Sequence, residues 1–411
     1  MGVKEQSAVH IRTACHTELG ALPSDWKVVE LGAFEPFITS GSRGWAAYYS
    51  DFGSPFIRIT NLSRSRIYPS LEDLRYVAVP LNNSEGLRTA LEDGDVLISI
   101  TADIGIIGLV THEIDLPAYI NQHIALVRLP PADVNSRYIA YFLAGAAAQR
   151  RFKAMTDAGA KAGMSLTGVH EVLVAVPPTA QEQTAIADAL GDADALIDSL
   201  EQLLTKKRQI KQGTMQELLT GRRRLPGFAG KWKTALLGEV ANVKTGAMNN
   251  QDKVEGAEYP FFVRSQTVER IDTYTHDCEA ILVPGEGGIG SIFHYIHGRF
   301  ALHQRVYGVT GFSDEVVGRF LFFYMRIFFG AHAMGNSVKA TVDSLRLPTF
   351  LNFEISLPPT KGEQIAIVGV LSDLEGEIEA IEARLTKARA LKQAIAQTLL
   401  TGRIRLVEPT A

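Results

Sequence analysis

Two stretches of the chain carry apolar residues at steps that alternate between four and three positions. They are Ile186, Leu190, Ala193, Ile197, Leu200 and Leu204 in the first stretch, and Ile367, Leu371, Leu374, Ile378, Ile381 and Leu385 in the second. This spacing places the apolar side chains on one seam of a helix and is typical of a coiled coil. A diproline precedes each stretch, and Gly221 or Gly402 follows it, which suits a helix start and a helix end. The pattern predicts two helices of about 40 residues, each ~60 Å long; the alternative is an amphipathic helix packed only on its own domain.

Charge is distributed unevenly along both predicted helices. Residues 181–200 carry five acidic side chains and no basic one, residues 201–225 are mainly basic, and the second stretch repeats this order. A parallel pair would set acid beside acid, whereas an antiparallel pair sets acid beside base along the whole length. The helix dipole favours the same polarity only in the terminal turns, so it does not account for the longer runs. We therefore predict an antiparallel coiled coil.

The segments before the two helices contain short apolar runs bounded by turn residues, as strands do. The predicted strands are 95–101, 124–129 and 172–176 in the first segment, and 280–283, 305–309 and 353–357 in the second. One helix is predicted in each segment, near 135–154 and near 314–331. Each segment is therefore expected to be an α+β domain with its sheet early and its helix late.

The chain repeats itself. Pro177-Pro178-Thr179, Glu182-Gln183 and Leu218-Leu219-Thr220-Gly221-Arg222 recur 181 positions later as Pro358-Pro359-Thr360, Glu363-Gln364 and Leu399-Leu400-Thr401-Gly402-Arg403. Weaker echoes align Trp26 with Trp232, and Phe56-Ile57-Arg58 with Phe262-Val263-Arg264. The predicted layout is an extension at 1–21, a variable domain at 22–176, a helical spacer at 177–225, a second variable domain at 226–357, a second spacer at 358–406 and a tail at 407–411.

Composition sets limits on the class of protein. The 411 residues are 46% hydrophobic with a net charge of −4, so each domain can bury a core and the chain is no generally basic protein that coats nucleic acid. Cys15 and Cys278 lie far apart, which excludes a disulfide framework and fits a reducing cytoplasm. The start lacks an apolar signal segment, and the most apolar run, 320–330, is short and contains Arg326. We expect a cytoplasmic protein without a membrane segment.

One motif raises the alternative of an enzyme. Gly285–Gly290 has the spacing G-x-G-x-x-G of a loop that binds a dinucleotide or S-adenosylmethionine. Such a loop needs a helix after it, but the residues that follow are typical of a strand, and Glu286 would repel phosphates; a glycine-rich turn of a sheet is favoured. The sequence contains no P-loop and no [DN]-P-P-[YF] tetrapeptide. His294 and His297 would face opposite sides of a strand, which disfavours a metal site.

Basic and amide side chains cluster in both variable domains. Arginine and asparagine read base edges, and lysine and arginine hold phosphates. The candidates for DNA binding are Arg58, Asn61, Arg64, Arg66, Gln122, His123 and Lys161 in the first domain, and Arg264, Gln266, Gln304, Arg305 and Lys339 in the second. For any single residue an ordinary solvated surface is the alternative.

The whole layout resembles the specificity subunit of type I restriction-modification enzymes. The resemblance rests on Pro-Pro-Thr-x-x-Glu-Gln twice, Leu-Leu-Thr-Gly-Arg twice, and Trp-Lys-x-x-x-Leu-Gly twice, and it extends from residue 22 to residue 406. It implies two target recognition domains that each read one half of a bipartite site in double-stranded DNA, separated by helices. The residues expected to bind partner subunits are then Pro177, Pro178, Glu182, Gln183, Pro358, Pro359, Glu363 and Gln364.

The resemblance further implies a non-catalytic chain whose partners do the chemistry. These would be two methyltransferase subunits that use S-adenosylmethionine and restriction subunits that use ATP and Mg²⁺, with no cofactor in this chain. The alternatives are an S-adenosylmethionine-dependent methyltransferase and a coiled-coil scaffold that binds protein only. An antiparallel pairing of the repeats would present the two domains to DNA as the halves of a symmetric dimer, with half-site centres ~34–36 Å apart.

Overall fold

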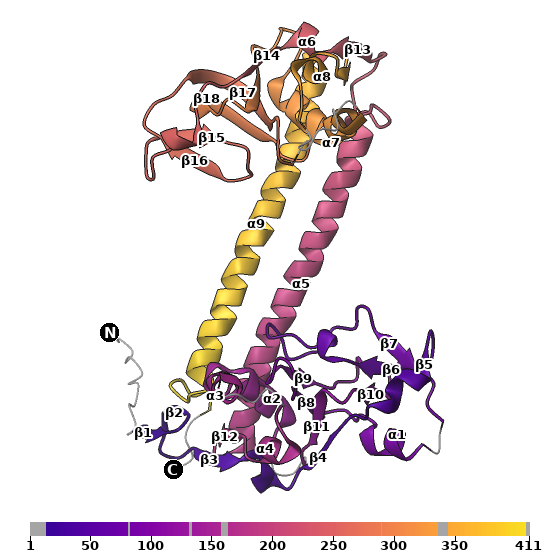
Figure 1. Ribbon diagram of the computed structural model, residues 1–411, viewed down its shortest axis with the longest axis vertical. Helices are drawn as coiled ribbons and strands as arrows, with labels where there is room; N and C mark the ends of the chain where they lie inside the picture. The colour runs from indigo at the N-terminus through magenta and orange to yellow at the C-terminus, as the bar shows by residue number, and fades with distance from the viewer. Residues whose placement is uncertain are drawn as a thin grey trace, which may run out of the picture. The chain divides into compact units, whose positions relative to one another are not determined.

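The computed structural model describes residues 14–80, 83–130, 134–157, 163–288, 290–335 and 344–407. The chain divides into two compact units, residues 1–200 with 384–411 and residues 201–383 (Figure 1). Each unit contains one α+β domain together with one half of each long helix. This division cuts across the predicted linear order of domains and spacers, because each helix contributes to both units.

The two long helices are α5 (Ala180–Leu218) and α9 (Lys361–Leu399), each of 39 residues. The predicted seam is on the inside of both: Ile186, Leu190, Ile197, Leu200, Leu204, Ile367, Leu371, Ile378, Ile381 and Leu385 are all buried. Gly221 and Gly402 follow the helices with φ of 68° and 65°, a left-handed conformation that glycine adopts without a steric cost. The pattern of apolar residues therefore predicted both helices correctly.

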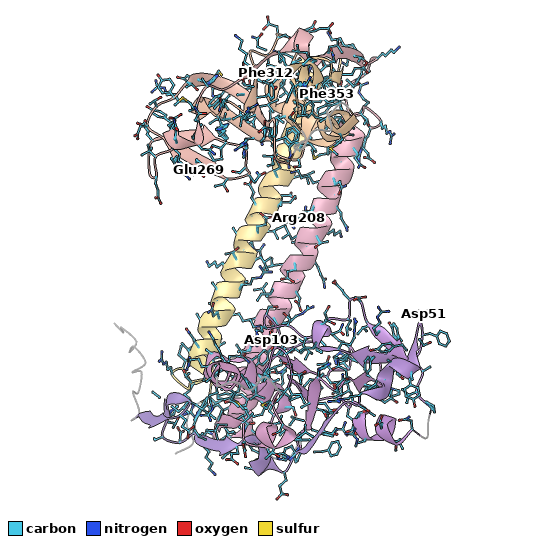
Figure 2. All side chains as sticks on the ribbon, viewed as in Figure 1. Asp51, Asp103, Arg208, Glu269, Phe312 and Phe353 are labelled. Carbon is cyan, nitrogen blue, oxygen red and sulfur yellow. The ribbon has the colours of Figure 1, made fainter. Side chains whose placement is uncertain are left out.

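The antiparallel pairing is visible within each unit. In the second unit, Lys207 Nζ lies 2.5 Å from Glu377 Oε2, and Arg208, labelled in Figure 2, donates to Glu382 at 2.6 Å. In the first unit, Lys392 near the end of α9 pairs with a residue early in α5, the buried Asp194. Residues from the basic half of one helix thus meet residues from the acidic half of the other, as the charge pattern predicted.

The first unit holds a four-stranded sheet and a second small sheet. The first has the order β4-β11-β8-β9, formed by β4 (Phe37–Ser40), β11 (Ile124–Arg128), β8 (Val96–Ser99) and β9 (Ile107–Leu109). The second has the order β10-β6-β7-β5, formed by β10 (Tyr119–Ile120), β6 (Ser54–Ile57), β7 (Arg75–Val77) and β5 (Tyr49–Ser50). Helices α2 (Ser136–Ala144), α3 (Ala146–Asp157) and α4 (Leu166–His170) follow. The predicted helix near 135–154 is thus two helices that meet at Gly145.

The second unit repeats this order in one six-stranded sheet. Its order β14-β19-β17-β18-β15-β16 is formed by β14 (Asn242–Thr245), β19 (Val306–Thr310), β17 (His276–Pro284), β18 (His294–Leu302), β15 (Tyr259–Phe262) and β16 (Val268–Ile271). Helix α7 (Gly318–Gly335) and the short α8 (Leu347–Leu351) follow. Phe353, labelled in Figure 2, packs in the same apolar core as residues of α7 and of the start of α9.

In each domain a strand at its start pairs with a strand at its end, just before the long helix. β3 (Lys27–Glu30) pairs with β12 (Leu173–Val176), and β13 (Lys233–Leu236) pairs with β20 (Glu354–Leu357), both antiparallel. β12 and β20 are the last strands that the sequence predicted. Beside these pairs, Trp26 packs on Gly402 and Trp232 packs on Gly221. The tryptophan of each repeat therefore covers the end of the helix that belongs to the other repeat.

The extension at 1–21 is described from Ala14 onwards. It forms β1 (Ala14–Thr17) and β2 (Gly20–Pro23), which pair antiparallel. Leu19 and Leu22 are buried in the apolar cluster that also contains Leu399 and Leu400. Among the described residues, no helix combines the length and the hydrophobicity needed to cross a membrane.

The register of the sheets corrects one alignment. The parallel pairing of β10 with β6 sets Ile120 opposite Ile57, and that of β18 with β15 sets Leu302 opposite Phe262. Ile57 is therefore equivalent to Phe262 and not to Val263, one residue away from the match made on the sequence. Gly41 and Gly246 support this alignment. A Cβ on Gly41 would lie 2.1 Å from the carbonyl oxygen of Ile120, and a Cβ on Gly246 would lie 2.1 Å from that of Leu302.

Candidate nucleic-acid interface

Three loops meet at one end of each domain, called the three-loop end below; in the first domain they come from both of its four-stranded sheets. They are the loop after β6 or β15, the loop after β8 or β17, and the turn before β11 or β19. The backbone holds the last two together in the same way twice: Ile100 N donates to His123 O at 2.9 Å, and Gly285 N donates to Arg305 O at 2.8 Å. A fourth segment joins them, since Met164 N donates to Ile100 O and Leu345 N donates to Gly285 O. The two domains therefore share one backbone frame at this end.

In the second domain this frame brings two predicted residues together. Arg264 Nη1 lies 3.2 Å from Glu286 Oε2, and Arg305 Nη1 lies 3.3 Å from Glu286 Oε1. The side chains of Arg264 and Arg305 are 44% and 59% exposed, while that of Glu286 is 23% exposed. Two exposed guanidinium groups thus flank one carboxylate, and the cluster carries one net positive charge.

Neighbouring residues fix this cluster. Gln304, another predicted residue, donates from Nε2 to Asn249 Oδ1 at 2.6 Å. The buried His303 accepts the backbone N–H of Arg305 at Nδ1, 3.0 Å away, so its proton is on Nε2. Burial, followed by the charges of Arg264 and Arg305, lowers the pKa of His303, which keeps the ring neutral in this role. Gln266 is exposed in the turn between β15 and β16.

The first domain carries different side chains on the same frame. Thr101 Oγ1 lies 2.5 Å from Nδ1 of His123, and Gln122 Nε2 lies 3.0 Å from Nε2 of the same ring. Because the amide of Gln122 donates, His123 accepts at Nε2 and donates to Thr101. The shared backbone bonds make His123 equivalent to Arg305 and Thr101 equivalent to Glu286.

Arg64 reaches the same region from the loop after β6. It bonds to the side chains of Asp103, labelled in Figure 2, and Gln149, and to Ile104 O at 3.1 Å. Its side chain is 47% exposed. A cavity of about 460 Å³ lies here, and its lining includes Ser63, Arg64, Asp103, Gly105, Gln149 and Lys153.

Three predicted DNA-binding residues are engaged elsewhere in the first unit. Asn61 is buried, accepts the N–H of Arg58 and donates to Ser70 O at 3.2 Å. Arg58 donates to Asp73 O at 2.9 Å and is only 22% exposed. Arg66 lies 3.7 Å from Asp198 of α5. The structure therefore corrects the prediction for Asn61 and Arg58, because both stabilise their own loop. Lys161 and Lys339 lie outside the described residues.

The repeated proline-glutamate-glutamine motif is also placed differently from the prediction. Glu182, Gln183, Glu363 and Gln364 are between 0 and 3% exposed. Glu363 is held by two nitrogens of Arg224 and Glu182 by Arg405, and each glutamine accepts a backbone N–H of its own domain, from Asn135 or Val317. Pro177 and Pro358 are buried, whereas Pro178 and Pro359 are exposed. We therefore revise the expectation that the glutamate and glutamine side chains contact partner subunits, because they are occupied within the chain.

The glycine motif at Gly285–Gly290 lies in the turn between β17 and β18. The next element in the chain is the strand β18 and not a helix. This is the sheet turn that the sequence favoured over a cofactor loop. His294 and His297 both lie on β18, and no group of three or more histidine, cysteine or acidic side chains suited to a metal occurs in the part of the chain that the structure describes.

Comparison with known proteins agrees with this architecture. The model of the type I restriction modification DNA specificity domain matches twice, at residues 23–212 and 229–389. The chain is 24% identical over 424 aligned positions to the putative type I restriction enzyme MjaX specificity subunit of Methanocaldococcus jannaschii, covering 95% of this chain and 96% of that one. It is 28% identical over 177 residues to the type I restriction enzyme EcoDI specificity subunit of Escherichia coli, covering 41% of this chain but only 37% of the relative.

Solved structures share the fold. The S subunit of a type I restriction-modification system from M. genitalium superposes with a TM-score of 0.62 at 12% identity, covering 91% of this chain and 96% of that one. A chain from a study of complex assembly and conformational transition in a type I R-M system has a TM-score of 0.52 at 17% identity, covering 93% and 99%. With two family matches that span most of its length, the chain belongs to the type I restriction-modification DNA specificity family. It is a specificity subunit, and its two α+β domains are DNA-recognition domains.

Proposed function

We propose that each domain reads one half of a bipartite site in double-stranded DNA with its three-loop end. The observation that carries this proposal is a common backbone frame with different side chains at equivalent positions, Thr101 and His123 in one domain and Glu286 and Arg305 in the other. The shared backbone orients the side chains, while different residues at equivalent positions recognise different bases. The two half-sites should accordingly differ in sequence.

We further propose that the chain has no catalytic role and that its partners do the chemistry. Two methyltransferase subunits would transfer methyl groups from S-adenosylmethionine, and restriction subunits would use ATP and Mg²⁺. The helical spacers would bind the methyltransferase subunits through their exposed side chains. Glu182 and Glu363 are buried and therefore not accessible to a partner. This proposal includes the division of the chain. The domains at 22–176 and 226–357 would recognise DNA, and the spacers at 177–225 and 358–406 would separate them.

Arg64→Ala tests the assignment of the reading end. We expect the variant, assembled with its methyltransferase partners, to bind its site more weakly by about 1–3 kcal/mol, because Arg64 is half-exposed at the three-loop end. Arg58→Ala is the matched control in the same segment and should leave DNA affinity unchanged, because that side chain is only 22% exposed, about half as much as that of Arg64. Fluorescence anisotropy with a labelled duplex measures both, and equal losses for the two variants would contradict this placement.

The same assay separates the proposal from a protein-binding scaffold. A specificity subunit makes the complex prefer its own site over a scrambled duplex of equal length and charge. A saturated complex that binds both duplexes equally would favour the scaffold and reject DNA recognition by these domains.

A further inference from the structure

We propose that Arg264, Arg305 and Glu286 read a G·C base pair in the half-site of the second domain, the arginines at the guanine and Glu286, which lies between them, at the cytosine. This inference rests on the proposed function and names part of the sequence that the second domain recognises. Its basis is the arrangement of one carboxylate between two exposed guanidinium groups, at 3.2 and 3.3 Å.

The two arginines are accessible to a ligand. A guanidinium group has five N–H donors, and the side chains of Arg264 and Arg305, which contact Glu286 through Nη1, are 44% and 59% exposed. Arg224 shows the contrasting arrangement, because two of its nitrogens bind Glu363, which is 1% exposed, and a third bonds to Gly230 O. Arg224 is thus used within the fold and its side chain is 23% exposed, whereas those of Arg264 and Arg305 are about twice as exposed.

The backbone around the cluster is held on every side. Arg305 lies next to the turn fixed by His303, and its carbonyl oxygen accepts the N–H of Gly285 at 2.8 Å. Ser265, beside Arg264, is held through its carbonyl oxygen, 3.1 Å from Nε2 of His294 on β18. Glu286 itself forms an isolated antiparallel bridge with Ser344. Side chains on a fixed backbone lose less conformational entropy when they bind, so this cluster is preorganised to bind one ligand in a defined geometry.

The carboxylate indicates a base pair and not a phosphate as the ligand. A phosphate within reach of both guanidinium groups would also be close to Glu286, and the two negative charges would repel each other. The major-groove edge of guanine is neutral and offers the acceptors N7 and O6, which arginine binds bidentately. The paired cytosine offers its N4 amino group as a donor, which a glutamate accepts. Two arginines around one glutamate therefore match a G·C pair better than they match the DNA backbone.

The first domain provides an internal control. At the positions equivalent to Arg305 and Glu286 it carries His123 and Thr101, a pair without a carboxylate. The half-site of that domain should not depend on Arg264, Arg305 or Glu286.

The test uses the complex of the full chain with its methyltransferase subunits and a duplex that contains its methylated site. Each guanine of the two half-sites is replaced in turn by 7-deazaguanine, which keeps Watson–Crick pairing but lacks the N7 acceptor. We expect one or two substitutions in one half-site to weaken binding by the wild type about 10-fold or more. In Arg305→Ala or Arg264→Ala the same substitution should have no further effect, while responses in the other half-site stay as in the wild type.

Glu286→Gln gives a readout that a purely structural role would not change. The variant removes the negative charge, so we expect tighter binding to unrelated DNA with a steeper dependence on salt, together with weaker discrimination of the G·C pair. Arg299→Ala is the control, because Arg299 pairs with Asp277 at 3.1 Å on β18 and β17 of the same sheet. It should leave both quantities unchanged.

The inference is overturned if no 7-deazaguanine weakens binding by the wild type, or if the loss persists at the same size in both arginine variants. Unchanged salt dependence in Glu286→Gln would likewise remove the role given to that residue. Failure of the proposed function is a different result, since the wild-type complex would then not distinguish its site from a scrambled duplex.

Discussion

Arg405→Ala should lower the free energy of unfolding of the first unit by about 3–5 kcal/mol. Arg405 follows α9 and pairs with two acids, the buried Glu182 at the start of α5 and Asp25 at 3.0 Å. Removing the guanidinium group leaves the Glu182 carboxylate in the interior without its main partner, and an uncompensated buried charge is strongly destabilising. Its effect should be concentrated where the end of α9 meets the start of α5.

The repeat supplies a second copy of the same experiment. Arg224 holds Glu363 as Arg405 holds Glu182, so Arg224→Ala should destabilise the second unit by a similar amount. Arg403→Ala and Arg222→Ala are the matched controls, because both side chains are exposed. Hydrogen exchange followed by mass spectrometry reports the two units separately. If the variants at the buried and at the exposed arginines lose equal protection from hydrogen exchange, the ion pairs with Glu182 and Glu363 do not stabilise the two units as proposed.

Seven residues inserted after Leu204 and seven after Leu385 should change the site that is methylated. Seven residues preserve the four-and-three spacing of the seam and lengthen each helix by about 10 Å, or about three base pairs of DNA. We expect the unspecified spacer between the half-sites to grow while both half-site sequences stay the same. The change is close to all-or-none, because the original spacing would no longer fit both domains at once.

Sequencing of methylated DNA from cells that express the insertion variant with its partner subunits measures this spacer. Circular dichroism and co-purification show whether the variant is folded and assembled. If an assembled variant methylates only the original spacing, the helices do not set the distance between the half-sites. An insertion of the same length in the loop before β13 would be the control, because it leaves α5 and α9 unchanged.

The elements that the sequence predicted best are those with a long periodic signal. Both helices and their antiparallel direction followed from the spacing of residues such as Leu190 and Leu371 and from the order of acidic and basic residues. Strands with a continuous apolar run, such as β8 and β11, were also predicted near their observed bounds. A period shared by many residues tolerates an error at any one of them, which is why these predictions succeed.

The roles of single polar residues could not be predicted in this way. Asn61 and Arg58 lie in a segment without acidic residues, and only the fold brings Ser70 and Asp73 back to them. The sequence predicts that the repeated Glu182 and Glu363 bind partners, yet they are held by Arg405 and Arg224, which lie 223 and 139 positions away in the chain, each just after the long helix of the other repeat. In the sequence Glu286 only argues against a cofactor loop, and its place between two arginines depends on loops that are distant in sequence.

The most direct test of the account exchanges one domain for the other. A chain in which residues 22–176 replace residues 226–357 carries the first recognition domain twice while keeping both helices. Sequencing of methylated DNA should then show the first half-site in both positions, at an unchanged spacer, and the second half-site should disappear. If the assembled variant still methylates the original second half-site, the domains do not determine the bases that are recognised, and the central claim is contradicted.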